Sequence, residues 1–154
     1  MTSKADRLVH LAQSVAGEHE LFFEIKGPGV GDRDTRRFMK ALRTKATDAF
    51  AIDHSEKELC GSSGLRVDFY FRDEGAIVEV ALSLRNPTSE FERDVFKAVL
   101  AAVSGNPVKR LVFISKPGAA KRLAQPGAKA IIDWLERTHN IRVDVRELLR
   151  SPAA

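Results

Sequence analysis

The feature that most constrains the fold is a predicted β-hairpin in the middle of the chain. Apolar and polar residues alternate over residues 66–71 and again over residues 76–84, which is the pattern of half-buried strands. Residues 72–75, with the sequence Arg-Asp-Glu-Gly, are typical of the turn between two such strands. Because the apolar faces of the two strands must coincide, Phe71 is predicted to pair with Ala76.

This register places two carboxylates, Asp68 and Glu79, directly opposite each other on the second face of the hairpin. Facing residues of this kind have Cβ atoms about 4.5–5.5 Å apart, and like charges there are destabilising. Three arrangements would compensate: a bound divalent cation, a basic neighbour such as Arg66, or a carboxyl group kept protonated by a raised pKa. An exposed sheet face that carries a charge cluster explains the pair as well as a functional site does.

The rest of the chain reads as helices that alternate with strands. Residues 111–114 form a continuous apolar run, which is typical of a strand that is covered on both faces. The prediction is an α/β domain with a central mixed sheet flanked by helices. Further helices are predicted at residues 3–16, from 32 or 34 to 50, from 88 or 89 to 104, and 126–139, and further strands at 21–26, weakly within 51–64, and at 141–145.

A chain of 154 residues is long enough for one domain with its own core. We therefore predict a single domain over residues 1–154, with an N-terminal helix and strand extension at 1–31 and the core at 32–150.

The chain contains one cysteine, Cys60, and no apolar run near the length of a membrane span. Residues 1–12 lack the apolar stretch of a signal peptide. We expect a cytoplasmic protein with no membrane partner.

The order Asp, hairpin turn, Glu within an apolar strand, helix and buried strand resembles the PD-(D/E)XK nuclease superfamily, the fold of many type II restriction endonucleases. The resemblance covers residues 34–114. It implies a restriction-endonuclease-like α-β-β-β-α-β core. It also implies that Asp68 and Glu79 are catalytic residues that bind Mg²⁺, and that the protein is a magnesium-dependent endonuclease that hydrolyses phosphodiester bonds.

The family pattern has a lysine two residues after the Glu, where this chain has Ala81. Some members of the superfamily take the lysine from the following helix, and the resemblance then assigns the catalytic role to Lys97. The alternative is that Lys97 forms an ion pair with Asp94 on a solvated helix face. Two functions follow: an active nuclease, or a catalytically inactive protein of the same fold that binds or regulates. An unrelated α/β interaction protein is a third.

A basic helix face is the candidate surface for nucleic acid. Arg36, Lys40 and Arg43 are spaced so that they share one side of the helix predicted to end at residue 50, and the net charge is +4. Such a face can neutralise phosphates, although a solvated surface explains it equally well. The resemblance favours DNA as the partner and is compatible with a homodimer.

Overall fold

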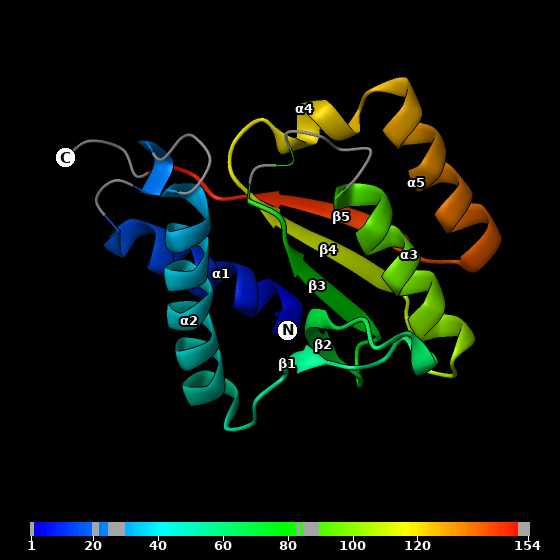
Figure 1. Ribbon diagram of the computed structural model, residues 1–154, viewed down its shortest axis with the longest axis horizontal. Helices are drawn as coiled ribbons and strands as arrows, with labels where there is room; N and C mark the ends of the chain where they lie inside the picture. The colour runs from blue at the N-terminus through cyan, green and yellow to red at the C-terminus, as the bar shows by residue number, and fades with distance from the viewer. Residues whose placement is uncertain (1, 20–21, 25–29, 83, 85–89, 151–154) are drawn as a thin grey trace.

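The computed structural model describes residues 2–19, 22–24, 30–82, 84 and 90–150. Its centre is a five-stranded mixed sheet in which the strands follow one another in chain order (Figure 1). The first three strands are antiparallel, and β3, β4 and β5 are parallel. The strands are β1 (Ser55–Lys57), β2 (Val67–Phe71), β3 (Ala76–Val80), β4 (Arg110–Ser115) and β5 (Arg142–Glu147).

Helices cover both faces of the sheet (Figure 1). Two lie on one face, α1 (Lys4–Glu18) and α2 (Val30–Phe50); three lie toward the other, α3 (Glu90–Val103), α4 (Ala119–Leu123) and α5 (Pro126–His139). Parallel neighbours need a crossover connection, and α3 supplies the one between β3 and β4. The predicted α/β class with a mixed sheet between helices is confirmed. Within the described ranges, no helix is long and apolar enough to cross a bilayer.

The predicted hairpin register is confirmed. Phe71 pairs with Ala76, and the pairing continues through Phe69 and Val78. The weak strand expected within residues 51–64 is β1, which pairs with β2 at the edge of the sheet. Continuing the β2–β3 register by one residue brings Asp68 opposite Glu79.

Alternation along the hairpin divides the core into two clusters. Phe69, Phe71 and Val78 pack with α1 and α2, whereas Ile77 packs with α3 and α5. Strict alternation predicts that Val67 shares the face of Phe69 and that Leu84 shares the face of Val78. This prediction is wrong for both residues, because both belong to the second cluster. Their side chains lie at the outer ends of the two arms, and Leu84 has a left-handed backbone, with φ of 41°. The two-residue period therefore holds only along the paired part of the hairpin.

The segment predicted as a strand over residues 21–26 is also different. Phe22–Glu24 form a turn of 3₁₀-helix, and the ring of Phe22 stacks on that of Phe38, with centroids 5.0 Å apart. Packing on α2 thus overrides the local strand preference. The rest of that segment and the predicted helix cap at residue 88 or 89 lie outside the described residues. Asn140 ends α5 in the left-handed conformation.

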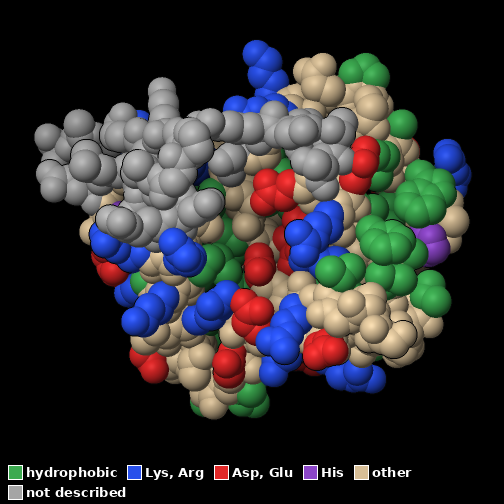
Figure 2. Space-filling model, in the orientation of Figure 1, with side chains coloured by type: hydrophobic (Ala, Val, Ile, Leu, Met, Phe, Trp, Pro, Cys, Tyr) green, Lys and Arg blue, Asp and Glu red, His purple; other side chains and the backbone are tan. Residues whose placement is uncertain are grey.

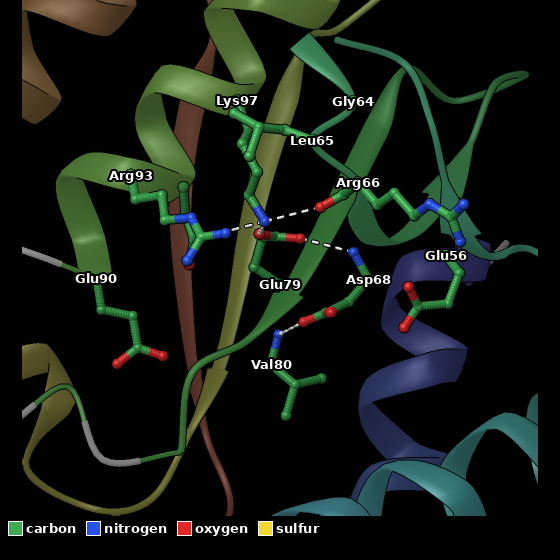
Figure 3. A pocket seen from close by; sticks show the side chains of 11 residues that line it. Glu56, Gly64, Leu65, Arg66, Asp68, Glu79, Val80, Glu90, Arg93 and Lys97 are labelled. Atoms are coloured by element: carbon green, nitrogen blue, oxygen red, sulfur yellow. Dashed lines mark hydrogen bonds and ion pairs between the residues drawn. The ribbon is translucent and has the colours of Figure 1, made fainter.

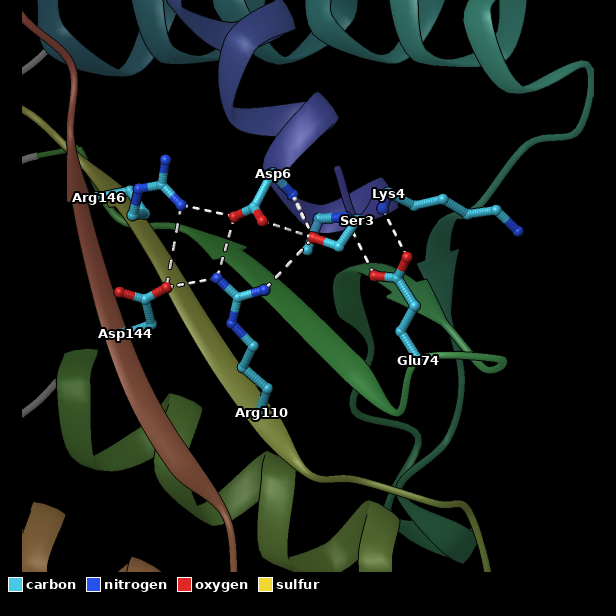
Figure 4. Close-up of polar contacts among 8 residues, drawn as sticks. Ser3, Lys4, Asp6, Glu74, Arg110, Asp144 and Arg146 are labelled. Atoms are coloured by element: carbon cyan, nitrogen blue, oxygen red, sulfur yellow. Dashed lines mark hydrogen bonds and ion pairs between the residues drawn. The ribbon is translucent and has the colours of Figure 1, made fainter. Parts of the chain in front are cut away.

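Polar contacts attach the start of α1 to the sheet (Figure 4). Asp6 accepts hydrogen bonds from Arg110 of β4, at 3.1 Å, and from Arg146 of β5, at 2.6 Å. Glu74, in the hairpin turn, accepts the backbone N–H of Ala5 at 3.2 Å. A carboxylate at this position also complements the helix dipole. The N-terminal helix is therefore held in place by charge as well as by its apolar face.

We expect Asp6→Asn to destabilise the fold. Partial burial alone would raise the pKa of Asp6, but hydrogen bonds from Ser3 and the two arginines outweigh it and lower the pKa to about 2. A lowered folded-state pKa contributes stability above the unfolded value of 3.8, and this stability is lost as the pH falls toward 2. Because Asp6 is partly exposed, we expect a loss of about 1–2 kcal/mol at pH 7, measured by urea denaturation.

The loss should shrink as the pH is lowered from about 4 toward 2. Asp133→Asn is the matched control, since Asp133 pairs with Lys129 on an exposed helix surface and such pairs contribute little. A destabilisation by Asp6→Asn that stays constant with pH would contradict the electrostatic explanation.

Candidate functional site

Asp68 and Glu79 line a pocket of about 710 Å³ between the hairpin and α3 (Figure 3). It is a polar hollow with several acidic and basic side chains in its wall. Its lining comprises Glu56, Gly64, Leu65, Arg66, Asp68, Glu79, Val80, Glu90, Arg93, Asp94 and Lys97. All three residues predicted as catalytic, Asp68, Glu79 and Lys97, therefore meet in one place.

The two opposed carboxylates are held by the backbone of the hairpin. The N–H of Asp68 donates to Oε1 of Glu79 at 2.7 Å, and the N–H of Val80 donates to Oδ2 of Asp68 at 2.8 Å. Each carboxylate thus accepts a hydrogen bond from the neighbouring strand just beyond the paired residues. These two hydrogen bonds orient both carboxylates on the hairpin.

Glu79 is buried, so the interpretation of an exposed sheet face is wrong. Its residue is only 1% exposed, because β3 is a central strand and α3 covers the face to which Glu79 belongs. An ionised carboxylate in such a place is unfavourable by several kcal/mol unless it is paired. The structure must therefore supply a partner.

The apolar face of α3 determines which side chain becomes that partner. Phe91, Val95 and Ala98 recur at helical spacing and are buried, and the ring of Phe91 packs on that of Phe113 with centroids 5.5 Å apart. Burying one phenylalanine stabilises by about 1.5–3 kcal/mol. This packing turns the adjacent stripe of the helix, which carries Lys97, toward β3.

Lys97 places its ammonium group among the carboxylates (Figure 3). Nζ forms an ion pair with Glu79, lies 3.2 Å from Oδ1 of Asp94 and donates to the carbonyl of Arg66 at 2.9 Å. The Lys97 side chain is only 9% exposed. The predicted pair with Asp94 therefore exists, but the interpretation as a solvated helix face is wrong.

Asp94 is the site residue that sequence reasoning did not assign. It is buried, and it contacts the same ammonium group as Glu79. Its signal was present in the spacing, because Glu90, Asp94 and Lys97 occupy one stripe of α3. The spacing alone does not say whether this stripe is buried or solvated. That depends on how the stripe packs against β3.

The pocket holds more negative charge than Lys97 can neutralise. Burial raises the pKa of Glu79 well above its usual value, and a hydrogen bond with Asp94 and the charges of Asp94 and Asp68 raise it further. Burial likewise raises the pKa of Asp68. For Lys97, burial acts to lower the pKa, but Glu79 and Asp94 outweigh it, so the net shift is upward. The ammonium stays charged, while the acids hold protons unusually tightly.

Arg66 does not neutralise the carboxylates. Its guanidinium turns away from them in Figure 3, lies 4.0 Å from Glu58, and belongs to a side chain that is 57% exposed. Only the backbone carbonyl of Arg66 takes part in the site, as the acceptor for Lys97.

The predicted basic residues of α2 differ in their contacts. Arg43 forms an ion pair with Glu56, which lines the pocket, so its charge is already matched. Arg36 and Lys40 are exposed. Figure 2 shows Lys and Arg side chains gathered over α2, next to acidic side chains at the centre of the same face.

Comparison with known proteins gave no relative to set beside this site. No family model matches the chain, and neither a curated protein nor a solved structure matches it. The functional argument therefore depends on the geometry and chemistry of the pocket itself.

We expect Asp68→Asn to stabilise the fold at neutral pH. A carboxyl whose pKa is raised by folding contributes stability that is complete below the unfolded pKa and is lost as the pH rises through the folded pKa. Asparagine keeps an oxygen to accept the Val80 N–H but removes the charge that opposes Glu79. The expected gain is about 1 kcal/mol at pH 7, measured by urea denaturation.

This gain should disappear below about pH 4, where Asp68 is protonated in both folded and unfolded chains. Asp48→Asn, at an exposed position of α2, is the control and should change little. If Asp68→Asn lowered the free energy of unfolding at pH 7, the charge of Asp68 would be stabilising and the electrostatic description of the pocket would be wrong.

Proposed function

We propose that the Asp68–Lys97 pocket is the active site of a magnesium-dependent nuclease of the PD-(D/E)XK type, which hydrolyses phosphodiester bonds. The observation that carries this proposal is the position of Lys97. A lysine from α3 reaches Glu79, one of the two opposed carboxylates of the hairpin, although the chain has Ala81 where the family pattern has its lysine.

The connectivity supports the same proposal. The resemblance predicts the element order α-β-β-β-α-β, and the run α2–β1–β2–β3–α3–β4 has this order. In this run the β2–β3 hairpin is antiparallel, and β3 is parallel to β4. Ala81 is buried in the same cluster as the apolar face of α3. A lysine side chain at position 81 would therefore lie on the same side of the sheet as Lys97.

The donor set of the pocket suits Mg²⁺. Among the described residues, no three His, Cys, Asp or Glu side chains converge to enclose a metal ion, but Mg²⁺ needs only one or two carboxylates together with water and phosphate oxygens. Asp68 and Glu79 would be those ligands. Asp68 uses Oδ2 for the Val80 N–H, and its other oxygen accepts no hydrogen bond from the described part of the chain. Burial raises the pKa of both acids, and neighbouring carboxylates raise it further, so a bound cation would stabilise their ionised forms.

Each residue of the pocket would have a separate role in catalysis. When bound, Mg²⁺ would neutralise phosphate charge and make water a better nucleophile. Lys97 would contribute a fixed positive charge beside the scissile phosphate. Asp94 would hold the ammonium in place, since it contacts Lys97 independently of Glu79. The Arg66 carbonyl accepts the third hydrogen bond of the Lys97 ammonium group.

A second candidate function is a non-catalytic protein of this fold that binds or regulates. The observation in its favour is that Lys97 has an acceptor for each of its three N–H groups: Glu79, Asp94 and the Arg66 carbonyl. An ammonium group that is fully engaged in this way can serve to stabilise the fold alone. The nuclease assay separates the two functions.

We expect the purified protein to cleave DNA in the presence of Mg²⁺ and to lose this activity in EDTA. Asp68→Asn should reduce the cleavage rate by about 100-fold or more, because it removes a charged metal ligand while the fold is retained. Lys97→Met should reduce the rate as strongly, with folding checked by circular dichroism. Cleavage of labelled plasmid and linear DNA is the measurement.

The matched controls are Asp48→Asn and Lys129→Met, which change one acid and one lysine on exposed helix surfaces. Both should cleave at the wild-type rate. Equal cleavage by the wild type and Asp68→Asn would indicate a contaminating enzyme. Absence of cleavage, combined with DNA binding by the wild type, would favour the non-catalytic candidate.

The exposed basic side chains of α2 should contribute to DNA affinity. We expect the double variant Arg36→Ala, Lys40→Ala to bind duplex DNA about tenfold more weakly and to lower the slope of log affinity against log salt by about 2, because each side chain neutralises one phosphate. Fluorescence anisotropy at several salt concentrations measures both quantities. Lys129→Ala, Arg137→Ala on α5 is the control, and equal losses in the two double variants would contradict a specific α2 surface.

A further inference from the structure

A second hollow, also of about 710 Å³, lies beside the hairpin turn. It shares no lining residue with the Asp68–Lys97 pocket. Its lining includes Tyr70 of β2 and Lys57 of β1, together with residues from the connecting segments. We call it the His54 hollow, after the imidazole in its wall.

The floor of the His54 hollow is apolar and held in a fixed shape. It consists of Leu59, Tyr70 and Pro107. The Tyr70 hydroxyl donates to the carbonyl of Pro107 at 2.7 Å, so its polar end is already satisfied and the ring is locked in position. Preformed apolar floors with a few polar groups around them are typical of small-molecule sites.

The wall around this floor carries two cations, Lys57 and Arg72, that form no ion pair with the described part of the chain. Among the residues that the structure describes, Lys57 makes no ion pair or side-chain hydrogen bond, and Arg72 makes a single contact, of 3.4 Å, with Asn106. Asp73, the acidic residue of the wall, is paired with Lys4 at 2.9 Å. Two cations therefore remain available to an anion.

The imidazole of His54 is a titratable group in the same wall, and its pKa would change when an anion binds. Its ring packs against Phe71, with centroids 4.9 Å apart. Burial lowers the pKa of His54, and the charges of Lys4 and Lys57 lower it further. These effects outweigh the upward effects of the backbone hydrogen bond with Tyr70 and of the charge of Asp73. The imidazole is thus neutral at pH 7. A bound anion would favour its protonated form and raise its pKa.

We propose that the His54 hollow binds a phosphate ester that carries an aromatic ring, as a nucleotide does. Lys57 and Arg72 would bind the phosphate through charge-assisted hydrogen bonds. The floor of Leu59, Tyr70 and Pro107 would cover the ring. The proposal does not depend on the nuclease activity, since the two pockets have no residue in common.

The test is a titration of the isotopically labelled full chain, followed by NMR, with adenosine monophosphate, inorganic phosphate and adenosine in separate experiments. We expect saturable shifts at His54, Lys57 and Tyr70 with adenosine monophosphate, weaker binding of either fragment, and an increase in the pKa of His54 on binding. Absence of saturable shifts at these residues would overturn the proposal. Equal affinity for inorganic phosphate and the nucleotide would also overturn it, because the apolar floor would then contribute nothing.

Substitutions provide the second arm of the test. Lys57→Ala and Arg72→Ala should each weaken nucleotide binding about tenfold, because each removes one charge-assisted contact. Lys121→Ala, which changes an exposed lysine of α4, is the control and should bind as the wild type does. Wild-type affinity in both Lys57→Ala and Arg72→Ala would overturn the proposal, whatever the nuclease assay shows.

Discussion

The ion pair between Lys97 and Glu79 is the interaction on which the site depends. Glu79 lies in the central strand of a sheet that is covered on both faces, where an unpaired carboxylate would be strongly destabilising. The ammonium of Lys97 makes that position tolerable, and Asp94 keeps the ammonium there. Without this group, the opposed carboxylates of the hairpin would have no cationic side chain in contact within the described residues.

The rest of the fold can be understood as the framework for this contact. The β2–β3 register sets Asp68 against Glu79, and the apolar face of α3 turns Lys97 inward. Since β3 and β4 are parallel, the chain must cross over between them, and α3 is that crossover. The connectivity of the sheet therefore places α3, which carries Lys97, over the acidic pair. The pKa values of Asp68 and Glu79 are raised because the ionised forms of both acids are unfavourable in this buried position.

Much of this arrangement was predictable because it follows from short-range patterns. The alternation of residues 66–71 and 76–80 determines the hairpin register. The burial of Glu79 and Asp94 was not predictable, since it depends on how closely two elements distant in sequence pack. For the same reason, the 3₁₀ turn at Phe22–Glu24 was mistaken for a strand: its conformation depends on contact with Phe38 of α2.

The most direct test of the account is a double-mutant cycle between Glu79→Gln and Lys97→Met, with the free energy of unfolding measured at pH 7 for the wild type, both single variants and the double variant. If the ammonium group is the compensating charge for Glu79, the two substitutions will be coupled by about 2 kcal/mol or more, since groups in direct contact in a buried network couple strongly. Additive effects, with a coupling energy near zero, would contradict the central claim that Lys97 and Glu79 stabilise each other.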